Sequence, residues 1–588
     1  MLICGILKVE IIVSGRYLVM DYKKLLSQSI APSTGLGENE VCEMIEIPPD
    51  SAMGDYALPC FKLAKTMRKA PPLIAQELAK NAFPDFISKV EVAGGYLNFF
   101  MDKQRFAKAT LEGISEDYGS SNIGEGKTVV MDYSSINIAK PFHIGHLSTT
   151  AIGNSLNRIY KFLGYKVVGV NHLGDWGTQF GKLIVAYKLW GNDEQIERDS
   201  IHALLDLYVR FHEEAEKDDS LNEEGRRWFK KIEDGDQEAL RIFNWFKELT
   251  LKEVGKVYDR LGVSFDSYAG ESFYNDKMQP VIDELKQKGL LEFSDGAYVV
   301  RMKLGQDKDG KDAVPPCIVL KSDGTSIYAT RDLAAAFYRK KTYDFYKCLY
   351  VVAYQQNLHF KQLFRVIELM GYDWAKDMVH VNFGMVSLVD GTLSTRKGKV
   401  VFLEDVLNAA VAKTREIIEE KNPNLPDKDE TAEKIGVGAV VFSALTNSRI
   451  KDIVFDLNKV LNFDGETGPY VQYTHARAMS VLRKAANSYD DASSPDYSAL
   501  CMEQAFSVLK LIESFPEEVV RAHEKYEPSF ITRHIILLAQ AFNRFYYDIR
   551  VIDDDKRATA ARLKLTSAVA QVIKTGLYLI GVEAPDRM

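Results

Sequence analysis

Residues 127–173 read KTVVMDYSSINIAKPFHIGHLSTTAIGNSLNRIYKFLGYKVVGVNHL, and this stretch decides the fold. Its start, 127–133, is a short strand with a continuous apolar run, as in strands buried on both faces. Residues 143–163 form a predicted helix that ends before Gly164, a residue suited to a helix C-terminus. A second strand follows at 165–173. Strand, helix and strand at this spacing predict a βαβ unit with a parallel sheet. The helix carries one apolar stripe, made of Leu147, Ala151, Ile152, Leu156, Ile159 and Leu163.

The junction between the first strand and this helix has the character of a nucleotide site. A helix N-terminus offers free N–H groups and a positive dipole end to phosphates. His143 and His146 are three residues apart, so both face one side of the first turn and can donate to charge developing on an α-phosphate. Gly145 leaves room for a flat base. Two capping histidines without chemistry are the alternative, but the position after a strand, with Lys140 nearby, favours the site.

Composition places the chain among ordinary globular proteins of several domains. It has 588 residues, of which 46% are hydrophobic and 27% charged. The net charge of −8 argues weakly against nucleic-acid binding, but it does not exclude a local basic surface.

Six cysteines are present, and neither a CxxC pair nor a zinc-type Cys/His cluster occurs. They are typical of reduced thiols in a cytoplasmic protein, and no metal site is expected. No apolar run approaches the roughly 18 residues of a membrane span.

The pattern along the chain predicts several parts. Residues 1–19 are an apolar extension outside the fold, and 20–118 form a small α+β unit. Residues 119–400 hold the parallel sheet, with a helical insertion at about 195–260 and a hairpin within 296–330 around Ser322-Asp323-Gly324. Helices without a strong strand pattern fill 401–460 and 461–588.

The longer motifs resemble those of arginyl-tRNA synthetases, which are class I enzymes. HIGH lies within SSINIAKPFHIGHL (134–147), and NHLGDWGTQFGKL (171–183) follows. The likeness runs from about Met20 to the C-terminal APDRM. It implies a multidomain α/β fold with a Rossmann-like catalytic domain at 119–400.

The same resemblance gives each remaining part of the chain an expected role. An additional domain for the tRNA elbow is expected at 20–118, a stem-contact region at 401–460 and a helical anticodon-binding domain at 461–588. The implied reaction activates L-arginine with ATP, accompanied by Mg²⁺ but not zinc, and transfers it to the 3′ end of tRNA(Arg). A monomer is the default.

The second class I signature, a basic loop that binds the triphosphate, matches residues 390–398 (DGTLSTRKG). Ser394, Arg396 and Lys397 are its candidate catalytic residues, while Thr392 and Thr395 stand where the signature has lysines. The family pattern assigns the missing charge to a lysine before HIGH, which Lys140 matches. Ser148 replaces an arginine that is common after HIGHL. The resemblance also places ATP against His143, Gly145, His146, Met385, Val386 and Ser394.

An arginine pocket needs carboxylates and neutral acceptors around a planar cation. Tyr328 and Asp332 are four apart on one face of a predicted helix. Alone, Asp332 fits a helix cap, Tyr328 a core tyrosine and Glu271 a solvated loop acid. The resemblance assigns arginine binding to Asp132, Ser135, Asn137, His143, Glu271, Tyr328, Asp332 and Gln356.

Candidate tRNA contacts come from two parts of the chain. Lys62 and Lys65 belong to a short basic run in the N-terminal part. Tyr470, Arg477 and Tyr546 belong to the helical C-terminal part, where aromatic and arginine side chains suit stacking on splayed bases. A solvated helix face and a packed bundle are the alternative interpretations.

Three other functions are compatible with parts of the sequence. A cysteinyl-type class I synthetase would need zinc-ligand cysteines. A catalytically silent RNA-binding paralogue finds support only in the weakened basic loop. A nucleotidyltransferase that shares only HxGH would lack the helical C-terminal third.

Overall fold

The computed structural model describes residues 22–138, 140, 142–305, 314–388, 401–488 and 494–588. They fall into two compact units. The first contains the described residues of 1–120 together with 477–517 and 537–573, and the second contains 121–476, 518–536 and 574–588. The extension expected at 1–19 lies outside the described residues.

The N-terminal part of the first unit is the α+β structure that the sequence predicts. A three-stranded antiparallel sheet has the order β1-β3-β2, and Gly94, at a φ of +59°, forms the turn between β2 and β3. Its elements are β1 (Tyr56–Pro59), β2 (Ile87–Ala93), β3 (Tyr96–Met101), α1 (Tyr22–Ile30), α2 (Glu38–Met44), α3 (Ala64–Met67), α4 (Pro71–Leu78) and α5 (Lys103–Glu112).

The first unit also includes parts of the long C-terminal helices. Tyr118 Oη donates to the Ile512 carbonyl at 3.1 Å, and Lys510 Nζ lies 2.7 Å from Asp55 Oδ1. These contacts join segments that are 394 or more residues apart in the sequence. The helices that contribute are α18 (Gly468–Ser488), α19 (Glu503–Lys525), α20 (Ser529–Asp548) and α21 (Lys556–Leu579).

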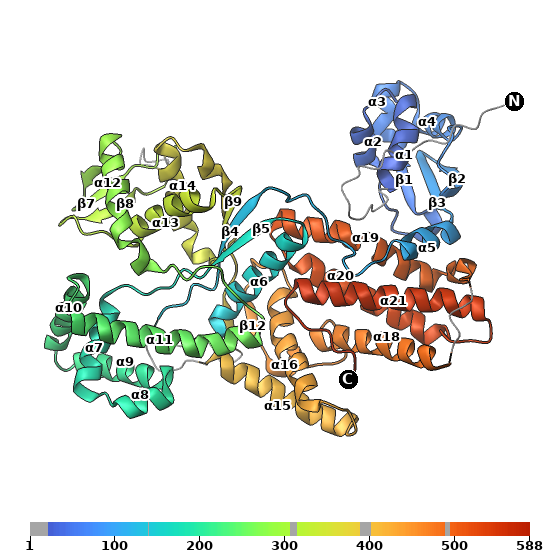
Figure 1. The fold of residues 1–588 in the computed structure, drawn as a ribbon. Helices are drawn as coiled ribbons and strands as arrows, with labels where there is room; N and C mark the ends of the chain where they lie inside the picture. Colours follow the sequence, from blue (N-terminus) through green and yellow to red (C-terminus); the bar gives the residue numbers. More distant parts are fainter. Residues whose placement is uncertain (1–21, 139, 141, 306–313, 389–400, 489–493) are drawn as a thin grey trace. The chain divides into compact units, whose positions relative to one another are not determined.

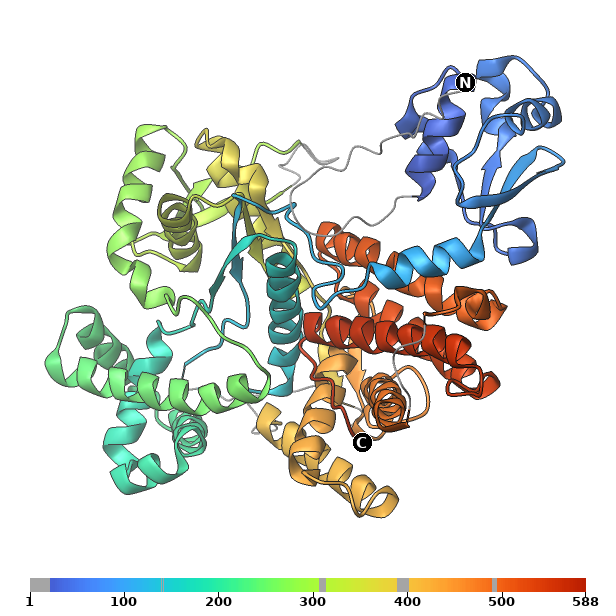
Figure 2. The same cartoon turned by 45° about the vertical axis from the view of Figure 1, so that its right-hand side comes forward.

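A four-stranded parallel sheet organises the second unit (Figure 1). The strands follow the order β10-β9-β4-β5, and β4 pairs in parallel with both β5 and β9. Helix α6 (Leu147–Phe162) connects β4 to β5 and packs against both, as Figure 2 also shows. The predicted βαβ unit is therefore confirmed, and Gly164 follows α6 with a φ of +84°. The strands are β4 (Thr128–Asp132), β5 (Lys166–Val170), β9 (Lys347–Tyr350) and β10 (Met378–His380).

The helical insertion is longer than the sequence predicts, because it begins at Thr178 rather than near 195. Helix α7 packs closely on α10, and a Cβ built on Gly181 would lie 2.0 Å from the Gly225 carbonyl oxygen. Residues 178–190 are apolar rather than charged, so the charge pattern that predicts the insertion does not include them. The helices are α7 (Thr178–Trp190), α8 (Asp193–Asp199), α9 (Ile201–Ala215), α10 (Ser220–Glu233) and α11 (Gln237–Arg260).

The hairpin expected within 296–330 is partly wrong. The tight turn lies earlier, at Asp295-Gly296, where φ values of +51° and +77° connect β6 to β7. Strand β8 does pair antiparallel with β7, but the turn at 322–324 leads into helix α13 (Tyr328–Tyr343). The strands are β6 (Glu292–Ser294), β7 (Ala297–Val300) and β8 (Cys317–Lys321), and α12 (Met278–Gln287) precedes them.

A short strand after residue 402 was missed. Strand β12 (Ile453–Phe455) pairs in parallel with β11 (Val386–Leu388), which lies far away in the sequence. Three residues carry too little pattern to reveal such a pairing. The helices of this region are α14 (Asn357–Leu369), α15 (Leu403–Lys421), α16 (Lys428–Leu445) and α17 (Leu457–Val460).

Two further properties concern the described residues only. None of their helices combines the length and the apolar character that a membrane span requires. The cysteines Cys42, Cys60, Cys317, Cys348 and Cys501 are free thiols.

Candidate active site

The two histidines of HIGH cap the turn that leads into α6. His143 precedes the 3-10 turn η4 (Ile144–His146), and its Nδ1 accepts the Gly145 N–H at 3.0 Å. His146 Nδ1 in turn accepts the His143 N–H at 3.2 Å. A neutral imidazole that accepts at Nδ1 carries its proton on Nε2. Capping therefore uses one nitrogen of each ring and leaves an Nε2–H donor on each for a ligand.

Both histidines are neutral at physiological pH. Burial lowers the pKa of His146 to about 3, and the charge of His143 adds to this effect. Burial also lowers the pKa of His143, with the nearby Lys140 ammonium as the second cause. Lys140 thus lies close enough to place a positive charge beside the pair. The turn presents neutral donors next to a cation, which suits a phosphate chain.

The HIGH turn contacts the segments that precede and follow the basic loop in the sequence. After the loop, Ile144 N–H donates to the Val401 carbonyl at 3.1 Å, and Leu403 N–H donates to Phe142 at 2.9 Å. Before it, strand β11 with Val386 lies against η4, and the Met385 N–H donates to Asp452 Oδ1 at 2.7 Å. The loop candidates Ser394, Arg396 and Lys397, together with Thr392 and Thr395, lie outside the described residues.

At the carboxyl end of β4, Asp132 forms a buried ion pair. Its Oδ2 lies 2.8 Å from Nη2 of Arg339, and the two side chains are 7% and 1% exposed. Ser135 Oγ donates to the other oxygen, Oδ1, at 2.6 Å. Ser134 and Ser135 have φ values of +69° and +43°. Strained backbone of this kind clusters at functional sites, where surrounding contacts hold it in place.

Tyr328 begins α13 and Asp332 lies one turn later, on the same face, as the sequence predicts. His359 of α14 lies beside both: its Nε2 is 2.6 Å from Asp332 Oδ2, and its ring centre is 5.0 Å from that of Tyr328. Burial opposes the charge of Asp332, but the hydrogen bond from His359 keeps the pKa of this carboxyl below its ordinary value. Gln356 is exposed just before α14.

Glu271 brings a second carboxylate into the neighbourhood of Asp332. It begins the 3-10 helix η5 (Glu271–Lys277), and its N–H donates to the Leu173 carbonyl at 2.9 Å. Burial raises the pKa of Glu271 to about 7; Arg331 opposes this shift, while Asp332 and Asp175 add to it. Asp175 is itself fixed by Lys247 Nζ at 2.5 Å and Ser272 N–H at 2.9 Å.

The loops after β4 and β5 are joined above the sheet. Ile138 N–H donates to the Gly174 carbonyl at 3.2 Å, and Gly174 N–H donates to Ile136 at 2.8 Å. A Cβ on Gly174 would lie 2.3 Å from Asn137 Oδ1, so a larger residue there would require the Asn137 side chain to move. Asn137 is thereby held exposed at the rim.

Comparisons with known proteins cover nearly the whole chain. The family model described as tRNA synthetases class I (R), catalytic domain, matches residues 112–457. Models of the DALR anticodon binding domain and of the arginyl tRNA synthetase N-terminal domain match 471–588 and 20–101. The arginine–tRNA ligase of Alkaliphilus metalliredigens is 54% identical over 573 residues, covering 97% of this chain and 100% of the relative. The chain belongs to the arginyl-tRNA synthetase family.

Other relatives and solved structures agree with this membership. The arginine–tRNA ligase of Halothermothrix orenii is 53% identical over 575 residues, with 97% and 100% coverage. The structure of the Thermus thermophilus arginyl-tRNA synthetase matches at a TM-score of 0.77 and 25% identity, covering 96% of this chain and 100% of that one. The Plasmodium falciparum enzyme shares the fold, at a TM-score of 0.77 and 22% identity over 96% and 98% of the chains.

The structure brings together most of the arginine-site residues that the family resemblance implies. Asp132 with Ser135, and Asp332 with Tyr328, lie around the carboxyl ends of the parallel strands, and Glu271 is near enough to Asp332 to feel its charge. The side chain of Gln356 is exposed to solvent in the structure.

Three residues of this synthetase site were missed: His172, Arg339 and His359. Arg339 lies seven residues after Asp332, which is two helical turns on the same face, so the spacing could have revealed it. His359 follows Gln356 by three residues. His172 was noted only as part of a family motif.

The candidate tRNA residues of this family member lie in different places. In the first unit, Lys62 is 3.9 Å from Glu46, Lys65 is exposed, and Arg477 contacts Asn543 and stacks on the Tyr546 ring at 5.3 Å. Arg477 and Tyr546 are therefore neighbours. In the second unit, Tyr470 is half-buried in α18.

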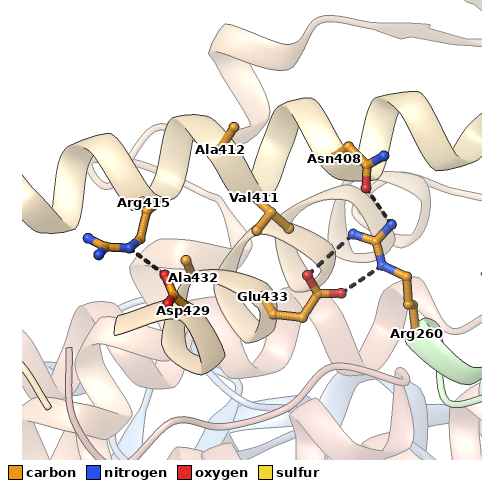
Figure 3. A pocket seen from close by; sticks show the side chains of 8 residues that line it. All are labelled: Arg260, Asn408, Val411, Ala412, Arg415, Asp429, Ala432 and Glu433. Carbon is orange, nitrogen blue, oxygen red and sulfur yellow. Dashed lines mark hydrogen bonds and ion pairs between the residues drawn. The ribbon is translucent and has the colours of Figure 1, made fainter. Parts of the chain in front are cut away.

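A hollow of about 260 Å³ lies between α15 and α16, away from these residues (Figure 3). Arg260, at the end of α11, is 2.7 Å from both Glu433 and Asn408, and Arg415 is 2.6 Å from Asp429. Both arginines are thus paired with acids. The contacts of Arg260 fasten the helical insertion to α15 and α16, so the hollow is a seam between packed elements and not the synthetase's substrate pocket.

Proposed function

We propose that the chain activates L-arginine with ATP and esterifies it to the 3′ end of tRNA(Arg). The supporting observation is a set of carboxylates around the ends of the parallel strands, beside the neutral donors of the HIGH turn. L-Arginine carries one cation at its α-ammonium and another at its guanidinium. Asp132 suits the first, and Asp332 with Glu271 suits the second.

In this proposal the arginine carboxylate attacks the ATP α-phosphorus and pyrophosphate leaves in line. The Nε2–H groups of His143 and His146 donate to the oxygens on which charge builds up, and Gly145 lets the nucleotide approach the turn. Lys140 supplies positive charge. Asn137, Ser135, Tyr328 and Gln356 complete the pocket as neutral hydrogen-bonding groups.

ATP binding is proposed along β11 and the HIGH turn. Met385 and Val386 line the base side, and Ser394, Arg396 and Lys397 are the proposed contacts to the triphosphate. Mg²⁺ enters with ATP as part of the substrate. Among the described residues, no group of three His, Cys, Asp or Glu side chains could hold a metal ion.

The tRNA contacts are proposed at Lys62 and Lys65 for the elbow and at Tyr470, Arg477 and Tyr546 for the anticodon. The proposed domain boundaries remain 20–118, 119–400, 401–460 and 461–588. A monomer and a cytoplasmic location stay predictions.

The function is tested by ATP–pyrophosphate exchange with each of the twenty amino acids, with and without total tRNA. We expect exchange with arginine alone, strongest when tRNA is present. A folded sample that binds tRNA but exchanges with no amino acid would contradict the proposal and favour a silent RNA-binding paralogue.

The raised pKa of Glu271 predicts how arginine binding depends on pH. With a pKa of about 7, Glu271 becomes protonated as the pH falls below 7 and then loses its attraction for a guanidinium. The KM for arginine should therefore rise by about tenfold between pH 8 and pH 6. His146 stays neutral over this range because its pKa is lowered to about 3, and burial lowers the pKa of His143 as well.

The matched control is Glu271→Gln. This variant should have a high KM for arginine at every pH and should lose most of the dependence between pH 6 and 8. An unchanged slope in Glu271→Gln would assign the titration to another group.

A further inference from the structure

A continuous chain of side chains connects the two carboxylates at the ends of the arginine pocket. Arg339 Nη2 is 2.8 Å from Asp132 Oδ2 and 3.4 Å from His172 Nδ1. His172 Nε2 is 3.7 Å from Asp332 Oδ1, whose other oxygen is 2.6 Å from His359 Nε2.

The donors and acceptors along this chain have one consistent assignment. Arg339 is a donor only, so Nδ1 of His172 accepts from it. The other ring nitrogen, Nε2, is the one that lies 3.7 Å from Asp332 Oδ1. His172 is half-buried, with 13% of its side chain exposed, and its ring packs against Tyr274 at 5.6 Å. His172 therefore contacts Arg339, which supports Asp132, and it also contacts Asp332.

The environment of Arg339 indicates a role other than simple stability. Its side chain is 1% exposed, and its Nε and Nη1 have no hydrogen-bond partner among the described residues. The guanidinium carbon of Arg339 lies 5.2 Å from the centre of the Tyr350 ring. Tyr350 Oη also has no hydrogen-bond partner among the described residues. Buried donors without partners are costly, and a buried ion pair is often no better for stability than apolar groups of similar size.

The elements that carry the chain explain what it can hold in place. Arg339 and Asp332 share helix α13, Asp132 ends β4, and His172 follows β5. The link through His172 ties the helix to the ends of two parallel strands. A shift of α13 along the sheet would change the separation between Asp132 and Asp332, and hence the length of amino acid that spans them.

We propose that His172 and Arg339 are positioning residues that fix the spacing of Asp132 and Asp332, and so set the preference for an amino acid of arginine's length. This inference rests on the proposed activation of arginine. Neither residue is assigned a contact with the reacting atoms.

Two substitutions of His172 separate its two nitrogens. In His172→Asn the amide occupies the place of Nδ1, so the contact with Arg339 is retained and the donor to Asp332 is lost. In His172→Gln the amide reaches the place of Nε2, so the donor to Asp332 is retained. We expect the KM for arginine to rise about tenfold or more in His172→Asn and less in His172→Gln, with kcat and the KM for ATP nearly unchanged.

The specificity readout is the ratio of kcat/KM for arginine to that for homoarginine, which is one methylene longer. This ratio should fall by about fivefold or more in His172→Asn, because the spacing of the pocket is no longer fixed. His212, which packs against Tyr208 on helix α9, provides the control His212→Asn, expected to leave the ratio unchanged. Thermal unfolding of each variant checks that it is folded.

The outcomes are distinct. If the wild-type chain does not activate arginine, the proposed function fails. If it does, and folded His172→Asn keeps both the KM for arginine and the homoarginine ratio, the positioning role is wrong. Equal effects of His172→Asn and His172→Gln on stability and on all kinetic constants would also overturn it, because they would indicate packing alone.

Discussion

Arg339→Met is expected to lose about 3–5 kcal/mol of unfolding free energy, because it leaves Asp132 buried without its partner. The pair is almost fully enclosed, at 1% and 7% exposure. Burial disfavours the guanidinium charge, but the Asp132 carboxylate outweighs burial and holds the pKa of Arg339 above its ordinary value. Urea unfolding at pH 7.5, followed by circular dichroism, gives the difference.

The control is the double variant Asp132→Leu/Arg339→Met, which replaces the whole ion pair by apolar groups of similar size. Most of the stability should return, since no uncompensated charge remains. Arginine activation should stay at least about 100-fold below wild type, because Asp132, the proposed partner of the α-ammonium group, and its support Arg339 are both gone. If the unfolding free energy of Arg339→Met lies within about 1 kcal/mol of the wild-type value, the ion pair is not a closed, desolvated contact.

His146→Asn is expected to lower kcat for adenylate formation by about 10²–10³-fold, the effect of removing one preorganised donor from a developing negative charge. Asparagine can replace Nδ1 as the acceptor of the His143 N–H, so the turn before α6 should persist. Only the Nε2–H donor disappears. The KM for arginine should change by no more than about twofold.

His146→Ala supplies the comparison for the same position. It removes both the donor and the cap, so it should add about 1 kcal/mol of lost stability to the same fall in kcat. Pyrophosphate exchange and thermal unfolding measure the two effects separately. Wild-type kcat in His146→Asn would mean that the histidine acts only as a cap.

The local secondary structure of this protein can be predicted from its sequence. The apolar run at 128–131 predicts β4, the apolar stripe predicts α6, and Gly164 predicts where α6 ends; the structure confirms all three. The HIGH turn follows from the same logic, because helix capping depends on residues only two or three positions apart. The spacing of Tyr328 and Asp332 likewise places both on one face of α13.

Features that depend on distant pairing were predicted less well. Strand β12 is three residues long and is defined by its partner β11, so its own sequence carries almost no pattern. The tight turn at Asp295-Gly296 was placed at the second Ser-Asp-Gly instead, because both copies have suitable turn residues. Both segments form turns in the structure, and the strand pairing of β6 with β7 places the hairpin at the first of them.

The sequence by itself determined the family and the βαβ core, and it predicts the candidate ligand residues, since motifs and periodicity are local properties of a chain. The tertiary structure alone decided which groups hold those residues in place. Asp132 meets Arg339, 207 positions later, and His172 reaches Asp332 across the sheet. These contacts form because α13 carries Arg339 and Asp332 to the carboxyl ends of the parallel strands. The protonation of Glu271 was decided in the same way, because burial and neighbouring charges arise only when the chain has folded.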